Sequence, residues 1–285
     1  MVAVADEALV DFVPAGRPGL FQAAPGGSPA NDAVGLARLQ VPVRLLARIA
    51  DDLLGHHIRA HLAGNGVDAS CAVRAAEPTS LAIVAVGRDG VVEYDFRIDG
   101  TADWQWRDEE LTDALDGGVF ALHSGSLALT MPPGADALQR LLAREVMTSP
   151  TTQLPAAADG RAPDAVRGRI EGLVGSSTRS RPAPTTWRGC CRAGPPEQVA
   201  EAWLAKGPSL VAVTLGPAGV IVAARQAGVL RRPGRNVAVV DTVGAGDAFM
   251  SALLAGLHRL DLLGADRRGD LRAVNAATIR IRDTL

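Results

Sequence analysis

The sequence predicts an α/β fold in which strands lead through glycine turns into helices. The apolar run 237–240 precedes a glycine-containing run over 241–247 and an amphipathic run over 248–259, which is the order of a strand, a turn and a helix. Gly26 and Gly27 likewise precede a helical pattern over 33–39. With 285 residues, of which 47% are hydrophobic, the chain can bury the core of one large α/β domain or of two smaller ones.

The remaining elements follow from hydrophobic periodicity and turn residues. Trp104 and Trp106 are expected to pack in the core. The predicted elements of the N-terminal half are a buried strand over 2–13, a strand over 41–46, a helix over 56–63, a β-hairpin over 79–97 and a helix from about 108. Those of the C-terminal half are a strand over 119–126, helices over 136–144, 164–174 and 197–206, strands over 210–215 and 220–222, and a helix that starts at 266.

Charge and cysteine content exclude several classes of protein. The formal net charge is −2 and no basic run stands out, so we expect neutral or small anionic ligands and no nucleic-acid partner. The three cysteines, at 71, 190 and 191, cannot all pair internally, which argues against a disulfide framework. No signal-peptide pattern or long uncharged apolar segment occurs, which predicts a cytoplasmic protein without a membrane partner.

The run Asp241–Phe249, with the sequence DTVGAGDAF, has the features of an anion site. Small residues at 244–246 allow a ligand to approach the backbone, and the first turn of a helix carries N–H groups and positive partial charge that suit a phosphate. Asp247 is placed to cap that helix, or to accept a proton from a hydroxyl that attacks the phosphate. For the four residues GAGD alone, a capped helix after a tight turn is the simpler interpretation.

The longer pattern resembles the signatures of the ribokinase-like, or PfkB-type, sugar kinases. DTVGAGDAF resembles their C-terminal signature, and GGSPAN at 26–31 resembles their N-terminal one. This resemblance implies one ribokinase-like domain over 1–285, with a mostly parallel central sheet flanked by helices and a small β-sheet lid from strands at about 12–22 and 79–98. It also implies that Gly244, Ala245 and Gly246 form an anion hole and that Asp247 is the catalytic base.

Further site residues are carried over from the same resemblance. Asp32 departs from the usual small or apolar residue, and we expect it to face solvent. Arg97 is either a substrate contact or an exposed arginine on a strand. The implied sugar contacts are Asp11, Gly26, Gly27, Asn31 and Arg97, and the implied nucleotide contacts are Thr214, Gly216 and Gly219 of a TLGxxG turn.

The implied reaction is transfer of the ATP γ-phosphate to a monosaccharide hydroxyl, with ATP and Mg²⁺ as cofactors and a monovalent cation such as K⁺ as an additional one. The whole pattern is most similar to that of fructokinases, so fructose is the expected sugar. Ribose, 2-keto-3-deoxygluconate and nucleoside kinases share enough of the pattern to stay open, as does a sugar-binding pseudokinase or relic. The sequence does not fix the oligomeric state, and the resemblance implies that a homodimer, where one forms, pairs through the lid strands. No protein metal site is expected, although His57 and His61 have the i, i+4 spacing of a ligand pair.

The pattern degrades over 149–194, where prolines, threonines and arginines follow neither period. Residues 180–193 can be back-translated so that a shift of one nucleotide reads VKASADDLAWLLPG, which is similar to a strand end and acidic helix of the family. Our hypothesis is that about 176–194 are a frame-shifted translation; genomic reads without compensating insertions or deletions would contradict it. The family also continues for another helix after the last residue of this chain, which predicts a truncated C-terminus.

Overall fold

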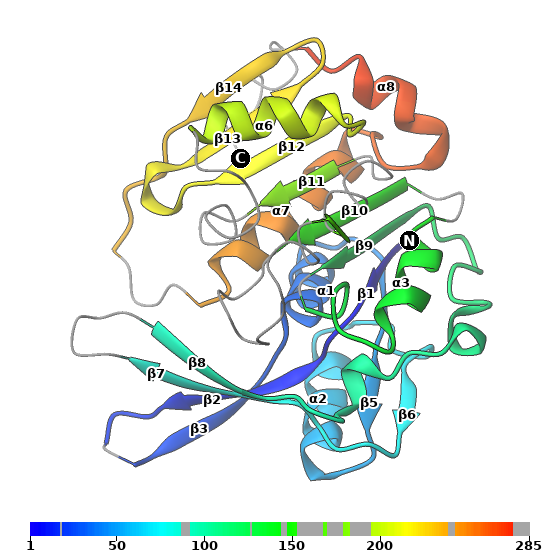
Figure 1. Cartoon of the computed structure of the whole chain (residues 1–285), viewed down its shortest axis with the longest axis vertical. Helices are drawn as coiled ribbons and strands as arrows, with labels where there is room; N and C mark the ends of the chain where they lie inside the picture. Colours follow the sequence, from blue (N-terminus) through cyan, green and yellow to red (C-terminus); the bar gives the residue numbers. More distant parts are fainter. Residues whose placement is uncertain are drawn as a thin grey trace.

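The central feature of the computed structural model is an eight-stranded sheet (Figure 1). The structure describes residues 1–17, 19–86, 92–125, 127–143, 147–152, 168–169, 179–182, 195–238 and 243–275. In spatial order the strands are β14 (Gly228–Arg232), β13 (Val220–Ala224), β12 (Leu210–Thr214), β11 (Arg179–Pro182), β10 (Met147–Thr152), β9 (Ala121–Gly125), β1 (Val2–Ala5) and β4 (Val43–Leu46).

The strands from β4 to β12 run parallel, and only β13 and β14 are antiparallel to their neighbours. The carboxyl ends of the parallel strands therefore meet at one edge, which is where ligands bind in open α/β sheets. The mostly parallel sheet is confirmed, as are the strands predicted over 41–46, 119–126, 210–215 and 220–222. Of the irregular segment, β11 lies in the sheet between β10 and β12, whereas most of 149–194 lies outside the described residues.

Helices cover both faces of this sheet because successive residues of β1 point to opposite sides. Val2 and Val4 belong to a core with α1 (Ser28–Arg38), α7 (Ala245–Arg259) and α8 (Arg268–Arg272). Ala3 and Ala5 belong to a second core with α3 (Ala135–Leu142), which also buries Trp104 and Trp106 as predicted. A third core lies where α6 (Pro196–Ala205) covers β12 and β13 (Figure 1).

A second sheet of four strands projects from the carboxyl end of β1 (Figure 1). Its order is β3 (Phe21–Gly26), β2 (Leu9–Pro14), β7 (Leu81–Val86) and β8 (Val92–Arg97). The single strand predicted over 2–13 is wrong, because the chain breaks between β1 and β2 at Asp6, whose φ is 140°. Two consecutive acidic residues, Asp6 and Glu7, stand at this break, and apolar residues lie on both sides of it. The residues around the break do not show that its two halves pair with different sheets, because that pairing is made with distant strands.

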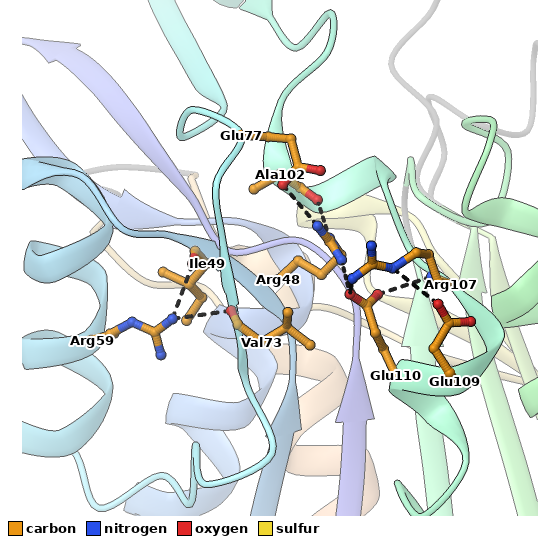
Figure 2. Close-up of polar contacts among 9 residues, drawn as sticks. All are labelled: Arg48, Ile49, Arg59, Val73, Glu77, Ala102, Arg107, Glu109 and Glu110. Carbon is orange, nitrogen blue, oxygen red and sulfur yellow. Dashed lines mark hydrogen bonds and ion pairs between the residues drawn. The ribbon is translucent and has the colours of Figure 1, made fainter.

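A buried arginine, Arg48, connects a third sheet, of two strands, to neighbouring segments of the chain (Figure 2). Arg48 lies on β5 (Arg48–Ala50), which pairs with β6 (Val73–Ala75), and its side chain is 3% exposed. Its guanidinium donates to the Ala102 carbonyl at 3.1 Å and to Glu77 at 2.8 Å, and it also pairs with Glu110. Burial opposes ionisation of Glu110, but hydrogen bonds and charge from Arg48 and Arg107 bring its pKa below the usual value.

Arg59 performs a similar role for the backbone from α2 (Leu53–Gly64). Its Nη2 donates to the carbonyls of Ile49 and Val73, each at 3.1 Å, so one side chain bridges the paired strands β5 and β6 (Figure 2). Burial lowers the pKa of this guanidinium from its ordinary value. The two arginines thereby hold β5 and β6 to the helix on one side and to the segment around Ala102 on the other.

Two further elements differ from prediction. The helix expected from about 108 is only a 3₁₀ turn over Asp108–Leu111, where the Glu110 carboxylate accepts a hydrogen bond from the Arg107 backbone N–H at 3.0 Å. The strand expected over 237–240 is not present at its described residues, and Val237 is 65% exposed. The chain leaves β14 after Arg232, and Gly234 lies against the Pro217 carbonyl, so β14 does not continue to Val237. The rest of that predicted strand, and the helices over 164–174 and after 275, lie largely outside the described residues.

Candidate active site

The site is built where the N-termini of α1 and α7 meet at the ligand-binding edge of the sheet. The two helices pack closely because Gly35 presents no side chain: a Cβ there would lie 2.2 Å from the Ser251 hydroxyl. That hydroxyl donates to the backbone carbonyls of Asp32 at 3.2 Å and Asp247 at 2.9 Å. Residues 216 or more positions apart in sequence are therefore brought into direct contact.

The carboxylate of Asp247 is held by two side chains from the first turn of α1. Ser28 Oγ donates to Oδ1 at 2.7 Å, and Asn31 Nδ2 donates to Oδ2 at 2.9 Å. Asp247 is 7% exposed and lies in the first turn of α7, where the helix dipole stabilises a negative charge. The carboxylate of Asp247 is thus buried and oriented. Asn31, predicted to contact the sugar, contacts this carboxylate.

The two glycines of GGSPAN permit close backbone approach, each for a different reason. Gly27 precedes α1 with φ 96°, and a Cβ there would lie 2.6 Å from the Glu7 carbonyl oxygen. At Gly26 a Cβ would lie 2.0 Å from Asp11 Oδ2, so the Asp11 carboxylate occupies the space that a side chain would take. The structure therefore brings Asp11, Gly26 and Gly27 together beside the start of α1.

Asp11 and Asp247 interact electrostatically across the site. Burial, together with the negative charge of Asp247, raises the pKa of Asp11 to about 6. A carboxylate with this pKa is ionised near neutral pH and protonated in mild acid. Two carboxylates close enough to interact suit a polyhydroxylated neutral ligand, because carboxylates accept hydrogen bonds from hydroxyl groups.

The predicted anion turn begins α7. Gly244 precedes the helix in the left-handed conformation with φ 72° and ψ 0°, and the helix starts at Ala245. Gly246 and Asp247 then lie in its first turn. The positive end of a 15-residue helix at this point fits a phosphate group, whereas Asp241 and Thr242 lie outside the described residues.

The predicted nucleotide turn lies at the carboxyl end of β12. Thr214 is the last residue of this strand, and a 3₁₀ turn over Gly216–Ala218 follows. Gly216 has φ 58° and Gly219 has φ 98°, and a Cβ at Gly219 would lie 2.0 Å from the Arg232 carbonyl oxygen. Because β12 runs parallel to β11 within the same sheet as β1, the turn lies on the same edge as the start of α1.

Arg97 lies at the end of β8 on the edge of the second sheet. Its side chain is 65% exposed and pairs with Asp95 at 2.7 Å. The structure therefore places it on the surface, with a partner of its own. His57 and His61 lie on α2, and no group of three His, Cys, Asp or Glu side chains among the described residues is arranged to hold a metal ion.

The prediction that Asp32 faces solvent is wrong. Its exposed fraction is 0%, and its Oδ2 lies 2.8 Å from Nε2 of His123, which is 1% exposed. The pair joins α1 to β9 in the interior. The sequence contains both partners, but 91 residues separate them, so only the tertiary contact reveals why a carboxylate is tolerated on the buried face of α1.

Ser28 is the site residue that sequence reasoning missed. It lies between Gly27 and Pro29, at the first position of α1, where a serine is ordinarily interpreted as a turn or cap residue. A hydroxyl in the first turn of a helix that follows a glycine pair was the available signal. The contact with Asp247 depends on how α1 packs against α7, which local sequence does not specify.

The fold and the paired acidic residues define a carbohydrate kinase, and comparisons with known proteins agree. The pfkB family carbohydrate kinase profile matches residues 1–281. A fructokinase of Rhizobium leguminosarum bv. trifolii is 31% identical over 271 residues, covering 92% of this chain and 81% of that protein. A fructokinase of Klebsiella pneumoniae is 32% identical over 272 residues, covering 89% and 83%. The chain belongs to the pfkB family of carbohydrate kinases.

Solved structures show the same ribokinase-like fold. The fructokinase of Xylella fastidiosa with bound ATP superposes with a TM-score of 0.85 at 24% identity, covering 98% of this chain and 87% of that one. The fructokinase of Vibrio cholerae with fructose, ADP and calcium bound has a TM-score of 0.79 at 23% identity, covering 95% and 90%. In the part of this chain that the structure describes, no helix is long and apolar enough to cross a membrane.

Proposed function

We propose that this protein transfers the γ-phosphate of ATP to a hydroxyl of a neutral monosaccharide, with D-fructose as the first candidate. The observation that carries the proposal is the buried Asp247 carboxylate at the N-terminus of α7, which is held by two donors and lies close enough to Asp11 to raise the pKa of that residue. The identity above 30% to two fructokinases supports fructose over ribose, 2-keto-3-deoxygluconate and nucleosides.

In the proposed reaction Asp11 and the backbone at Gly26 and Gly27 bind and orient the sugar. Asp247 accepts the proton of the attacking hydroxyl as its oxygen bonds to the γ-phosphorus and the bond to ADP breaks. The proton then leaves Asp247 to solvent after the products depart. The turn over Gly244–Gly246 and the first turn of α7 stabilise the negative charge that develops on the phosphoryl group.

The residues present fit a nucleotide bound with a divalent cation, since a left-handed glycine turn at a helix N-terminus suits phosphate oxygens. Thr214, Gly216 and Gly219 would hold the nucleotide. When bound, MgATP supplies the phosphoryl group, and Mg²⁺ neutralises charge on its phosphates. A monovalent cation such as K⁺ is a further proposed cofactor, and a V. cholerae fructokinase variant is known with fructose, ADP and potassium bound.

The four-stranded sheet is proposed to act as a lid that shields the reaction from water and to pair with a second copy in a homodimer. The support for pairing is apolar surface at its tip, where Leu20 is 52% and Phe21 is 44% exposed, beside a groove of about 410 Å³. Sedimentation equilibrium tests it: a monomer at micromolar concentration refutes the dimer. We place the protein in the cytoplasm, where its nucleotide is available; fractionation of the native host tests this.

The decisive experiment measures sugar-dependent ADP release with MgATP, in the presence and absence of K⁺. D-Fructose, D-ribose, 2-keto-3-deoxygluconate and a nucleoside are compared, and Asp247→Asn is the matched control. We expect turnover with fructose that Asp247→Asn lowers by about 10²–10⁴-fold while sugar binding is retained. Sugar binding without turnover in the unmodified chain identifies a pseudokinase instead, and turnover that survives Asp247→Asn refutes the assigned base.

A further inference from the structure

The carboxylate of Asp247 receives one hydrogen bond on each oxygen from α1. Ser28 Oγ lies 2.7 Å from Oδ1, and Asn31 Nδ2 lies 2.9 Å from Oδ2. A carboxylate oxygen can accept more than one hydrogen bond, so these two donors leave acceptor positions for a substrate hydroxyl. The carboxylate is therefore oriented before any ligand binds, and its two donors come from a single helical turn.

The two donors restrict the carboxylate in a way that neither achieves alone. The terminal torsion of an aspartate is broad, and one hydrogen bond leaves the second oxygen to swing about the first. With Ser28 on one oxygen and Asn31 on the other, the carboxylate plane is set by α1, not by solvent. Proton transfer requires the acceptor oxygen within hydrogen-bond distance of the attacking hydroxyl, so a small misplacement lowers the rate steeply.

The position of the Ser28 hydroxyl is itself set by rigid packing. Gly35 and Ser251 fix the separation of α1 and α7, and Gly27 fixes the entry of the chain into α1 at φ 96°. Ser28 lies one residue after that turn. The hydroxyl that contacts Asp247 is thus delivered by the helix pair, and it is not an adjustable surface group.

We propose that Ser28 is a positioning residue for the kinase reaction, acting through Asp247 by holding its Oδ1 in the orientation that accepts the substrate proton. The proposal rests on the proposed function of Asp247 as the base. It assigns to Ser28 an effect on kcat in preference to an effect on sugar affinity. A serine that only packs α1 against α7 would instead change stability and leave kcat unaltered.

The test compares Ser28→Ala with Ser28→Thr and with the control Ser70→Ala, using kcat, KM for the sugar and thermal unfolding. Ser70→Ala makes the same substitution away from α1 and α7, since Ser70 lies beside Asp68, near the amino end of β4. We expect Ser28→Ala to lower kcat about tenfold, with KM changed less than about twofold. Ser28→Thr, which keeps a hydroxyl, should recover most of kcat. Ser70→Ala should keep both kcat and KM.

Each outcome decides the proposal. A Ser28→Ala variant with unchanged kcat, a loss confined to KM, or a loss that Ser28→Thr does not recover overturns the positioning role while the kinase function stands. An unmodified protein that shows no sugar-dependent turnover overturns the kinase function and the Ser28 role together. A tenfold loss of kcat that threonine recovers, with Ser70→Ala fully active, establishes the role.

Discussion

Acidification should reduce sugar phosphorylation through Asp11. Burial and the nearby charge of Asp247 raise the pKa of Asp11 to about 6. Its ionised form accepts hydrogen bonds through both oxygens, whereas the protonated form loses part of this capacity. The pH dependence of kcat/KM reports ionisations of the free enzyme, so kcat/KM for fructose should fall as pH drops through about 6.

The size of the effect follows from that pKa. A group with a pKa of about 6 is about one-tenth ionised at about pH 5 and almost fully ionised at about pH 7.5. If only the ionised form binds sugar productively, kcat/KM should be about tenfold lower at pH 5 than at pH 7.5. The assay is ADP release at subsaturating fructose across this range, on protein that remains folded by circular dichroism.

Asp11→Asn is the control, because the amide has nearly the same shape and does not titrate. Its kcat/KM should be lower near neutral pH, and the transition near pH 6 should disappear. A transition that stays near pH 6 in Asp11→Asn would show that another group controls it and would refute the reasoning. A profile of the unmodified protein that is flat between pH 5 and pH 7.5 would refute it as well.

Three further predictions concern stability. Burial raises the pKa of Asp103 to about 6, so the folded state binds a proton that the unfolded chain releases above its usual pKa of 3.8. This lowers the free energy of unfolding as pH rises from about 4 through about 6, by up to about 3 kcal/mol. Urea unfolding should therefore show Asp103→Asn to be more stable than the unmodified protein at about pH 7.5, and a less stable variant would contradict this. Gly27→Ala should lower the free energy of unfolding by about 1–3 kcal/mol and weaken sugar binding, because Gly27 has a φ of 96° and a Cβ there would meet the Glu7 carbonyl. Gly64→Ala is the control and should be tolerated, because a Cβ at Gly64 meets nothing within 4 Å. Equal effects of the two substitutions would count against the close approach of the backbone at Gly27. Arg48→Ala removes a buried partner of Glu110 and should lower the free energy of unfolding by about 3–5 kcal/mol. Arg74→Ala, at a side chain that is 67% exposed, should lower it by only about 0–1 kcal/mol. A small loss for Arg48→Ala in the same urea assay would show that the buried network contributes little to stability.

The strands and helices with clear periodicity were predictable from the sequence, since burial of one face imposes a repeat that the residues must follow. The glycine turns and the candidate base were predictable for a related reason: they are Gly26 and Gly27, the turn at 244–246, and Asp247. Backbone approach to a ligand needs residues without side chains, and proton transfer needs an ionisable group. Those requirements are local, so they remain visible in a single stretch of residues.

Contacts between distant segments could be decided only by the tertiary structure. The break at Asp6 separates two strands that join different sheets, and each sheet is completed by strands distant in the sequence. Asp32 is tolerated in the interior because its carboxylate pairs with His123 on β9. Ser28 reaches Asp247 because Gly35 lets α1 and α7 pack closely. The sequence alone determined the family and the fold class, and it singled out Asp247 as the proposed base. The packing of α1 against α7 decided which side chains hold that base, because a hydrogen bond depends on the distance between atoms and not on the separation of residues along the chain.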